Sequence, residues 1–236
     1  MKRLIQIFYV VIPAKAGIQV LFKTCGRVWI PAFAGMTEYT YTARRGGIIF
    51  MIIHPSENKT IHIDPAAERE IIEIQEQGSA TIYIGANKTL RLDVVLAGTD
   101  ASVKIIGRFL GINRDIQEII VRAVMQAPRT DCHIDFRTAL DGASSSFFDG
   151  LIHVEEGAKN ARGFLSYRGL LLSPNARAKP IPRLEVLTKE VVSLGHAASV
   201  GKIDAEQLFY LQSRGLSGKE AEKIIVEGFL GGEIMA

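Results

Sequence analysis

Short apolar runs recur between residues 61 and 187, and their rhythm restricts the fold more than any other feature of the sequence. Glycine, asparagine, aspartate and proline separate the runs, as expected of turns between strands. The expected strands cover residues 81–84, 90–96, 102–106, 116–125, 132–140, 147–154, 164–172 and 183–187. Many short strands at regular spacing predict an all-β sandwich, a barrel or a β-helix.

Two of these runs indicate how the strands are buried. Residues 133–137 alternate, so Ile134 and Phe136 point to one face while the polar side chains point to the other. Residues 170–172 are three consecutive leucines, which favours burial on both faces. Residues 71–77 fit either a strand or a helix that follows the upstream Asp-Pro pair. Periodicity alone does not separate a sandwich from a parallel β-helix.

After Gly201 the pattern becomes helical. Asp204 followed by Gln207 has capping-box spacing and opens a helix, which Arg214 and Gly215 end. The sequence therefore changes from strands to helices close to its C-terminal end.

A second capping box, Ser217 with Glu220, opens another helix, which Gly231 and Gly232 close. The two helices form a predicted hairpin at the end of the β region. Basic and acidic residues balance across this hairpin, so a DNA-reading helix–turn–helix is not favoured.

The first fifty residues differ in charge from the rest of the chain. They carry seven Lys or Arg and one acidic residue, whereas the remaining 186 residues carry 21 basic and 24 acidic ones. The body is therefore mildly acidic, which argues against a nucleic-acid footprint.

The same fifty residues contain a repeat. Residues 1–16 imitate a secretory signal, with a charged start, an apolar run and an Ala-Lys-Ala cleavage pattern. Residues 12–18 recur, little altered, as residues 30–36, which resembles the translated product of a palindromic repeated DNA element found between bacterial genes. We expect residues 1–50 to be a non-native or unstructured leader, with the true start at Met51. A cleaved signal peptide and a genuine structured extension are the alternatives.

The two cysteines, Cys25 and Cys132, lie far apart and form neither a disulfide framework nor a zinc-ligand spacing. A reducing compartment is the natural interpretation. The chain has no G-x-x-x-x-G-K-[ST] phosphate loop and no apolar span of about 20 residues, which excludes a membrane permease.

Residues 195–216, GHAASVGKIDAEQLFYLQSRGL, resemble the C-terminal signature of the SufB/SufD family of iron–sulfur cluster assembly proteins. The hallmark is a His-x-Ala segment, a Gly/Lys-Ile-Asp turn and a Gln-Leu-Phe-Tyr-Leu helix ending in Ser-Arg-Gly, and most positions match in order and spacing. Residues 148–158 and 170–187 are similar to the family's β-helical core. The resemblance covers about residues 145–230.

This resemblance implies a mainly β fold, in which a right-handed parallel β-helix is followed by a C-terminal helical hairpin. The implied regions are the leader at residues 1–50, a β-helix core at 51–190 and a helical segment at 191–236. Family members pair through their β-helices, dock a SufC-type ABC ATPase on their C-terminal helices, and build an iron–sulfur cluster at the subunit pair.

The expected role is a non-catalytic, cytoplasmic subunit of the SUF complex, not an enzyme. The iron–sulfur cluster would be held transiently at the subunit interface, and no nucleotide would be bound directly. The expected partners are the SufC-type ATPase and either a SufB-type subunit or a second copy in a homodimer, with neither nucleic acid nor membrane.

The resemblance assigns His196 to the pairing interface as a metal ligand of the nascent cluster. A structural histidine at the turn into the helices is the alternative. The implied partner-binding residues are Leu208, Phe209, Tyr210, Leu211 and Arg214. An apolar stripe is more often core than interface, but the adjacent Phe209 and Tyr210 cannot both share the burial of the main stripe.

The chain departs from the family pattern in two respects. The scaffold subunit carries a cysteine about twenty residues before the histidine, where Ala176 stands in this chain. Because thiolate is the usual iron ligand, the chain looks like the SufD side of the pair. Cys132, the only cysteine of the body, is expected to be a small buried side chain. The body is also shorter than in family members, which leaves room for a minimal homodimer.

Two other functional classes remain. An exported β-helical binding module, released by a cleaved N-terminal signal, would hold no iron and bind no ATPase. An enzyme could use the carboxylates of Asp141, Asp149, Glu155 or Glu156, but no nucleophile–base arrangement or paired-acid motif stands out.

Overall fold

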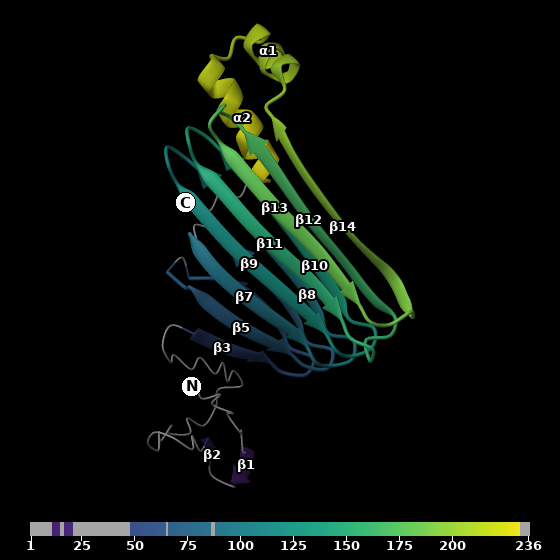
Figure 1. Ribbon diagram of the computed structural model, residues 1–236. Coiled ribbons are helices and arrows are strands. Elements are labelled where there is room, and N and C mark those ends of the chain that lie inside the picture. Colours follow the sequence, from purple (N-terminus) through teal and green to yellow (C-terminus); the bar gives the residue numbers. More distant parts are fainter. Residues whose placement is uncertain (1–10, 15–16, 21–47, 65, 86–87, 232–236) are drawn as a thin grey trace, which may run out of the picture. The chain divides into compact units, whose positions relative to one another are not determined.

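Figure 1 shows the computed structural model, which describes residues 11–14, 17–20, 48–64, 66–85 and 88–231. The chain divides into two units, Met1–Tyr39 and Thr40–Ala236. In the first unit the described residues form an antiparallel pair of short strands, β1 (Val11–Ala14) and β2 (Gly17–Val20). The rest of the first 47 residues, which carry most of the predicted leader, lies outside the described residues, and the leader stays a prediction.

The second unit winds into a parallel β-solenoid of two six-stranded sheets (Figure 1). The odd sheet contains β3 (Ile48–Ile53), β5 (Arg69–Ile74), β7 (Thr89–Leu96), β9 (Ile116–Met125), β11 (Ser145–Val154) and β13 (Arg177–Val186). The even sheet contains β4 (Asn58–His62), β6 (Ser79–Ile84), β8 (Ser102–Gly111), β10 (Asp131–Leu140), β12 (Ala161–Leu171) and β14 (Val191–Lys202). The chain alternates between the sheets, strand by strand. The expected mainly β, helically wound fold is thus confirmed, and a sandwich is excluded.

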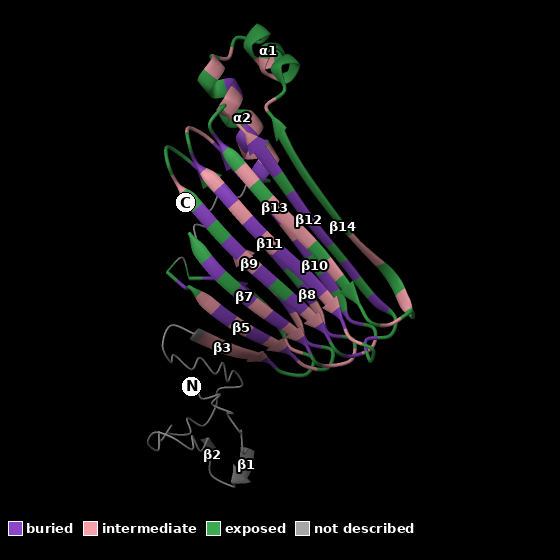
Figure 2. Cartoon of the chain, in the orientation of Figure 1, coloured by how far each residue is buried: buried purple, intermediate pink, exposed green. Residues whose placement is uncertain are grey.

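The core lies between the two sheets because apolar residues occupy alternate positions along the strands. In β5 and β6 half-buried and buried residues alternate without exception, and the stripes continue along the later strands (Figure 2). Parallel register stacks the inward positions of successive strands into rows, such as Leu92 beside Val121. Burial of these rows, at roughly 25 cal/mol per Å², is the main stabilising contribution.

An aromatic stack fills the interior near the later strands. The ring of Phe148 lies 4.7 Å from that of Phe136 and 5.4 Å from that of Tyr167, centroid to centroid. Gly107 makes this possible, because a Cβ there would lie 1.9 Å from the Phe136 ring.

One corner of the solenoid repeats the same turn in successive windings. At each copy a residue other than glycine has positive φ, and the set is Ser56, Gln77, Asp100, Arg129 and Asn160. Each of these residues donates its N–H to a carbonyl of the next turn, as Asp100 does to Pro128 at 3.1 Å. The hydrogen bonds between turns offset the cost of the left-handed conformation.

Some strands differ from the sequence-based expectation. Residues 71–77 contribute to β5 and not to a helix, and β14 was not expected as a strand. The expected division between residues 190 and 191 falls between β13 and β14, inside the solenoid. Leu170 is buried on the outer face because α2 covers it, which explains the continuous leucine run.

Two helices follow β14: α1 (Ala205–Ser213) and α2 (Gly218–Leu230). The capping box of Ser217 with Glu220 is confirmed. Asp204 is the N-cap of α1, but its side chain accepts from the N–H of Glu206 and not from that of Gln207. Across the described residues, no helix has the length and hydropathy needed to cross a bilayer.

Candidate functional site

The solenoid ends in two edge strands, β13 and β14, which differ in how their free edges are protected. Arg177 N–H donates to the carbonyl of Ser144, the residue just before β11, at 3.0 Å. Because backbone directions alternate along a strand, Pro180 and Pro182 direct their nitrogens toward the free edge. Two prolines that lack N–H groups therefore block strand addition to the odd sheet at this edge.

The free edge of β14 is open. Ile203 N–H donates to the Leu171 carbonyl on β12 at 3.4 Å, so alternate residues from His196 to Lys202 direct their N–H and C=O groups away from β12. No proline interrupts β14, and its side chains are mostly exposed (Figure 2). A long, exposed edge strand without proline is a template for pairing with another strand.

His196 lies on β14 and reaches across to β13. Its Nδ1 lies 3.0 Å from the carbonyl oxygen of Pro182. A carbonyl can only accept, so Nδ1 carries the hydrogen and the lone pair of the neutral ring is on Nε2. A backbone carbonyl on the second nitrogen is the arrangement that orients metal-binding histidines. Sequence reasoning missed Pro182, because the two residues meet only once the strand register is known.

The donors around His196 do not form a complete metal site. Among the described residues, no group of three or more His, Cys, Asp or Glu side chains is placed to hold a metal ion. Cys132 is fully buried in the core, and burial, with the charge of Asp131, raises the pKa of its thiol. Its side chain thus lies where a small apolar residue would lie, away from the edge strands.

The partner-binding residues expected from the sequence lie on α1 and at its C-cap. No residue of α1 is buried. The side chains of Phe209 and Tyr210 are 71% and 57% exposed. The Arg214 guanidinium lies 5.2 Å from the centroid of the Tyr210 ring, and this contact holds the ring on the helix surface. Leu208 and Leu211 are half-buried.

An open cleft lies beside this exposed pair. It is lined by Asp204, Glu206, Gln207, Tyr210, Leu211 and Ile225. Its lining combines the carboxylates of Asp204 and Glu206 with the apolar side chains of Leu211 and Ile225. It lies against α1, whereas His196 contacts β13, so the structure does not bring the two sets of predicted residues into one cluster.

The fold defines the class of protein: a parallel β-solenoid that carries a helical hairpin after its last strand. Residues 76–229 match the family model described as SUF system FeS cluster assembly, SufBD core domain. The chain therefore belongs to the SufBD family.

Curated relatives agree with this assignment. A protein of Mycobacterium tuberculosis named iron–sulfur cluster assembly SufBD family protein is 31% identical over 209 residues, which cover 77% of this chain and 52% of the relative. The iron–sulfur cluster assembly protein SufD of Bacillus subtilis is 43% identical over 88 residues, 37% of this chain and 20% of the relative. The chain spans about half the length of the first of these relatives.

Proposed function

We propose that this chain is a non-catalytic, cytoplasmic subunit of the SUF iron–sulfur cluster assembly complex. It binds a SufC-type ABC ATPase through its C-terminal helices and pairs through the last strands of its solenoid. The observation that carries the proposal is the exposure of Phe209 and Tyr210 on a helix that buries no residue of its own.

The composition of α1 supports a docking role. A nine-residue helix is too short to be stable alone in water, so α1 depends on its cap at Asp204 and on packing against α2. The two adjacent aromatic residues, Phe209 and Tyr210, leave most of their surface outside that packing. Aromatic residues of this kind supply most of the binding free energy at protein interfaces.

The free edges of β13 and β14 support a single pairing mode. Proline blocks the odd sheet, whereas β14 offers backbone donors and acceptors, so we infer that β14 carries the pairing. The partner is a SufB-type subunit or a second copy of this chain.

The iron–sulfur cluster is the cargo of this assembly and not a resident group. His196 would contribute one imidazole nitrogen, with its tautomer fixed by Pro182. Since no thiolate of the described residues lies beside it, the remaining ligands would come from the paired subunit. A subunit that supplies one ligand and no thiolate fits the SufD-type member of the pair, because Ala176 stands where the scaffold subunit has a cysteine. No nucleotide is bound by this chain directly.

Docking can be measured by titrating the cognate ATPase into the full chain. Phe209→Ala and Tyr210→Ala should each weaken binding at least about tenfold, because interface anchors contribute roughly 2 kcal/mol or more. Ile116→Ala is the matched control, since Ile116 is an equally exposed apolar residue on the solenoid. Equal affinity of all three variants and the wild type would contradict the docking role.

A further inference from the structure

Three arginines occupy the same position in three successive strands of the even sheet. Arg108 on β8 pairs in register with Arg137 on β10, which pairs with Arg168 on β12. Parallel neighbours lie about 4.8 Å apart, so three like charges are stacked on the outer face of the sheet. Such a stack is destabilising unless other groups compensate it. We call these three residues the arginine ladder.

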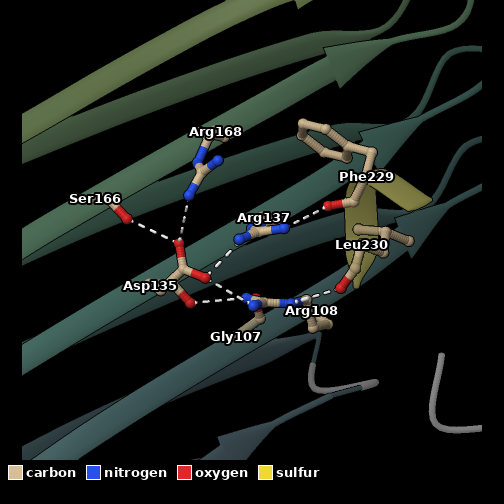
Figure 3. A network of polar contacts seen from close by, with 8 residues as sticks. All are labelled: Gly107, Arg108, Asp135, Arg137, Ser166, Arg168, Phe229 and Leu230. Atoms are coloured by element: carbon tan, nitrogen blue, oxygen red, sulfur yellow. Dashed lines mark hydrogen bonds and ion pairs between the residues drawn. The ribbon is translucent and has the colours of Figure 1, made fainter. Parts of the chain in front are cut away.

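One carboxylate lies at the centre of the ladder (Figure 3). Asp135 Oδ2 is 2.7 Å from Nη2 of Arg108 and 3.2 Å from Nε of Arg137, and Oδ1 is 3.5 Å from Nη2 of Arg168. Ser166 donates its hydroxyl to Oδ1 at 2.8 Å. The Asp135 side chain is only 14% exposed. A single negative charge against three positive ones leaves a surplus of positive charge.

Two of the ladder arginines, Arg108 and Arg137, contact the carboxyl end of α2 (Figure 3). Arg108 Nε donates to the Leu230 carbonyl at 2.7 Å, and Arg137 Nη1 donates to the Phe229 carbonyl at 2.9 Å. The last carbonyls of a helix have no partner within it and carry partial negative charge. No basic residue stands in the last turn of α2, so the solenoid supplies the cations that a helix usually supplies itself.

Packing fixes the same end of the helix. Val226 and Leu230 pack against Ala139 and Leu170 on the even sheet. The described contacts of α1 are chiefly with α2. The position of α1 on the solenoid therefore depends on how α2 is held.

We propose that Arg108 and Arg137, oriented by Asp135, are positioning residues that clamp the carboxyl end of α2 and thereby fix the orientation of the helical hairpin on the solenoid. The consequence for ATPase docking rests on the function proposed above. Arg168 belongs to the ladder, but its described ion pair is with Asp135 and not with α2, and its side chain is 48% exposed.

Hydrogen exchange of the full chain alone tests the clamp. In Arg108→Gln/Arg137→Gln the backbone amides of α2 should exchange at least about tenfold faster, because two charge-assisted hydrogen bonds are lost. Arg168→Gln is the matched control, because it removes one ladder charge without removing a bond to α2. Exchange in the solenoid strands should stay unchanged in both proteins.

Unchanged exchange of α2 in the double variant would overturn the proposal, as would an equal effect of Arg168→Gln. If the double variant does not fold, Arg137→Lys is measured in its place, since it keeps the charge but loses the forked geometry that reaches Phe229. Faster exchange of the α2 amides in Arg137→Lys supports the clamp, and unchanged exchange overturns it. ATPase affinity of the same proteins separates the two proposals. If the wild type does not bind the ATPase, the docking proposal is wrong. The exchange rates of the α2 amides still test the clamp, because they are measured on the chain alone.

Discussion

At the residue scale, the hydrogen bond between His196 and the Pro182 carbonyl determines which imidazole nitrogen is free to bind a metal. The carbonyl of Pro182 fixes the tautomer of the imidazole. In the assembled complex, His196→Ala should therefore lower the bound iron after anaerobic reconstitution, while the complex itself still forms. Iron is measured by a colorimetric assay on the purified complex. The matched control is His133→Ala, an exposed histidine on the outer face of β10. Equal iron in wild type and His196→Ala would leave His196 as a structural histidine.

Tyr167 is buried and bonds to two hydroxyls inside the solenoid. Its hydroxyl lies 2.7 Å from Thr138 Oγ1, and burial raises its pKa, although bonds to Ser146 and Thr138 oppose this. Tyr167→Phe should cost about 1–3 kcal/mol of unfolding free energy, because buried polar partners lose their bond. Urea unfolding measures the loss. Tyr83→Phe, at a half-buried position, should change the free energy by less than about 0.5 kcal/mol. Similar effects at both sites would contradict this account.

Some residue roles could be predicted from the sequence and others could not. Ser217 with Glu220 was predictable, because a cap depends on neighbours three residues apart. The partner of His196 was not, because Pro182 lies on a different strand. The ladder of Arg108, Arg137 and Arg168 left a signal in its spacing of 29 and 31 residues. That spacing becomes informative only when the length of each winding is known.

At the scale of elements, Asp135 links β10 to α2 through the arginines, and this link should depend on pH. Burial opposes the charge of Asp135, but hydrogen bonds from Ser166 and Arg108, with the charges of Arg108 and Arg137, hold its pKa below the usual value. A carboxylate with a lowered folded pKa stabilises the fold above its unfolded value, about 3.9, and loses this contribution as pH falls through the folded pKa.

Asp135→Asn should therefore be less stable than wild type by about 1–3 kcal/mol at pH 7, because charged hydrogen bonds are lost. The difference should begin to shrink as pH falls below about 4, where the carboxyl group of the unfolded chain takes up a proton, and should keep shrinking until the pH passes the lowered pKa of the folded protein. Unfolding free energies of both proteins from pH 7 to pH 3 measure it. A difference that does not vary with pH would show that the charge of Asp135 is not what stabilises this region.

The strands were predicted more fully in the middle of the chain than at its end. Residues 116–125 were predicted with the bounds that β9 has, because apolar residues alternate there. β14 was missed because its outward positions hold Ser193, Gly195, Ala197 and Ser199, which are not typical strand formers. Such a strand obtains its conformation from pairing with β12, which a local pattern does not reveal.

At the scale of the whole molecule, the start of the solenoid bears on the predicted leader. Met51 lies inside β3, which begins at Ile48, and Phe50 pairs with Ile71 of β5. A chain shortened to begin at Met51 loses half of its first strand. It should melt about 2–4 °C below a chain that begins at Ile48, since partly covered apolar surface of β5 becomes exposed. Thermal unfolding compares the two. Equal melting temperatures would show that residues 48–50 add nothing to the solenoid.

The measurement that tests the central claim most directly is anaerobic purification of the tagged full chain from its own cell, with the subunits identified by mass spectrometry. The proposed function predicts an ABC ATPase and a second SufBD-family chain, or a second copy of this one, in fixed ratio. A folded chain recovered without an ATPase, above all one with a cleaved N-terminus outside the cytoplasm, would contradict it and favour an exported binding module.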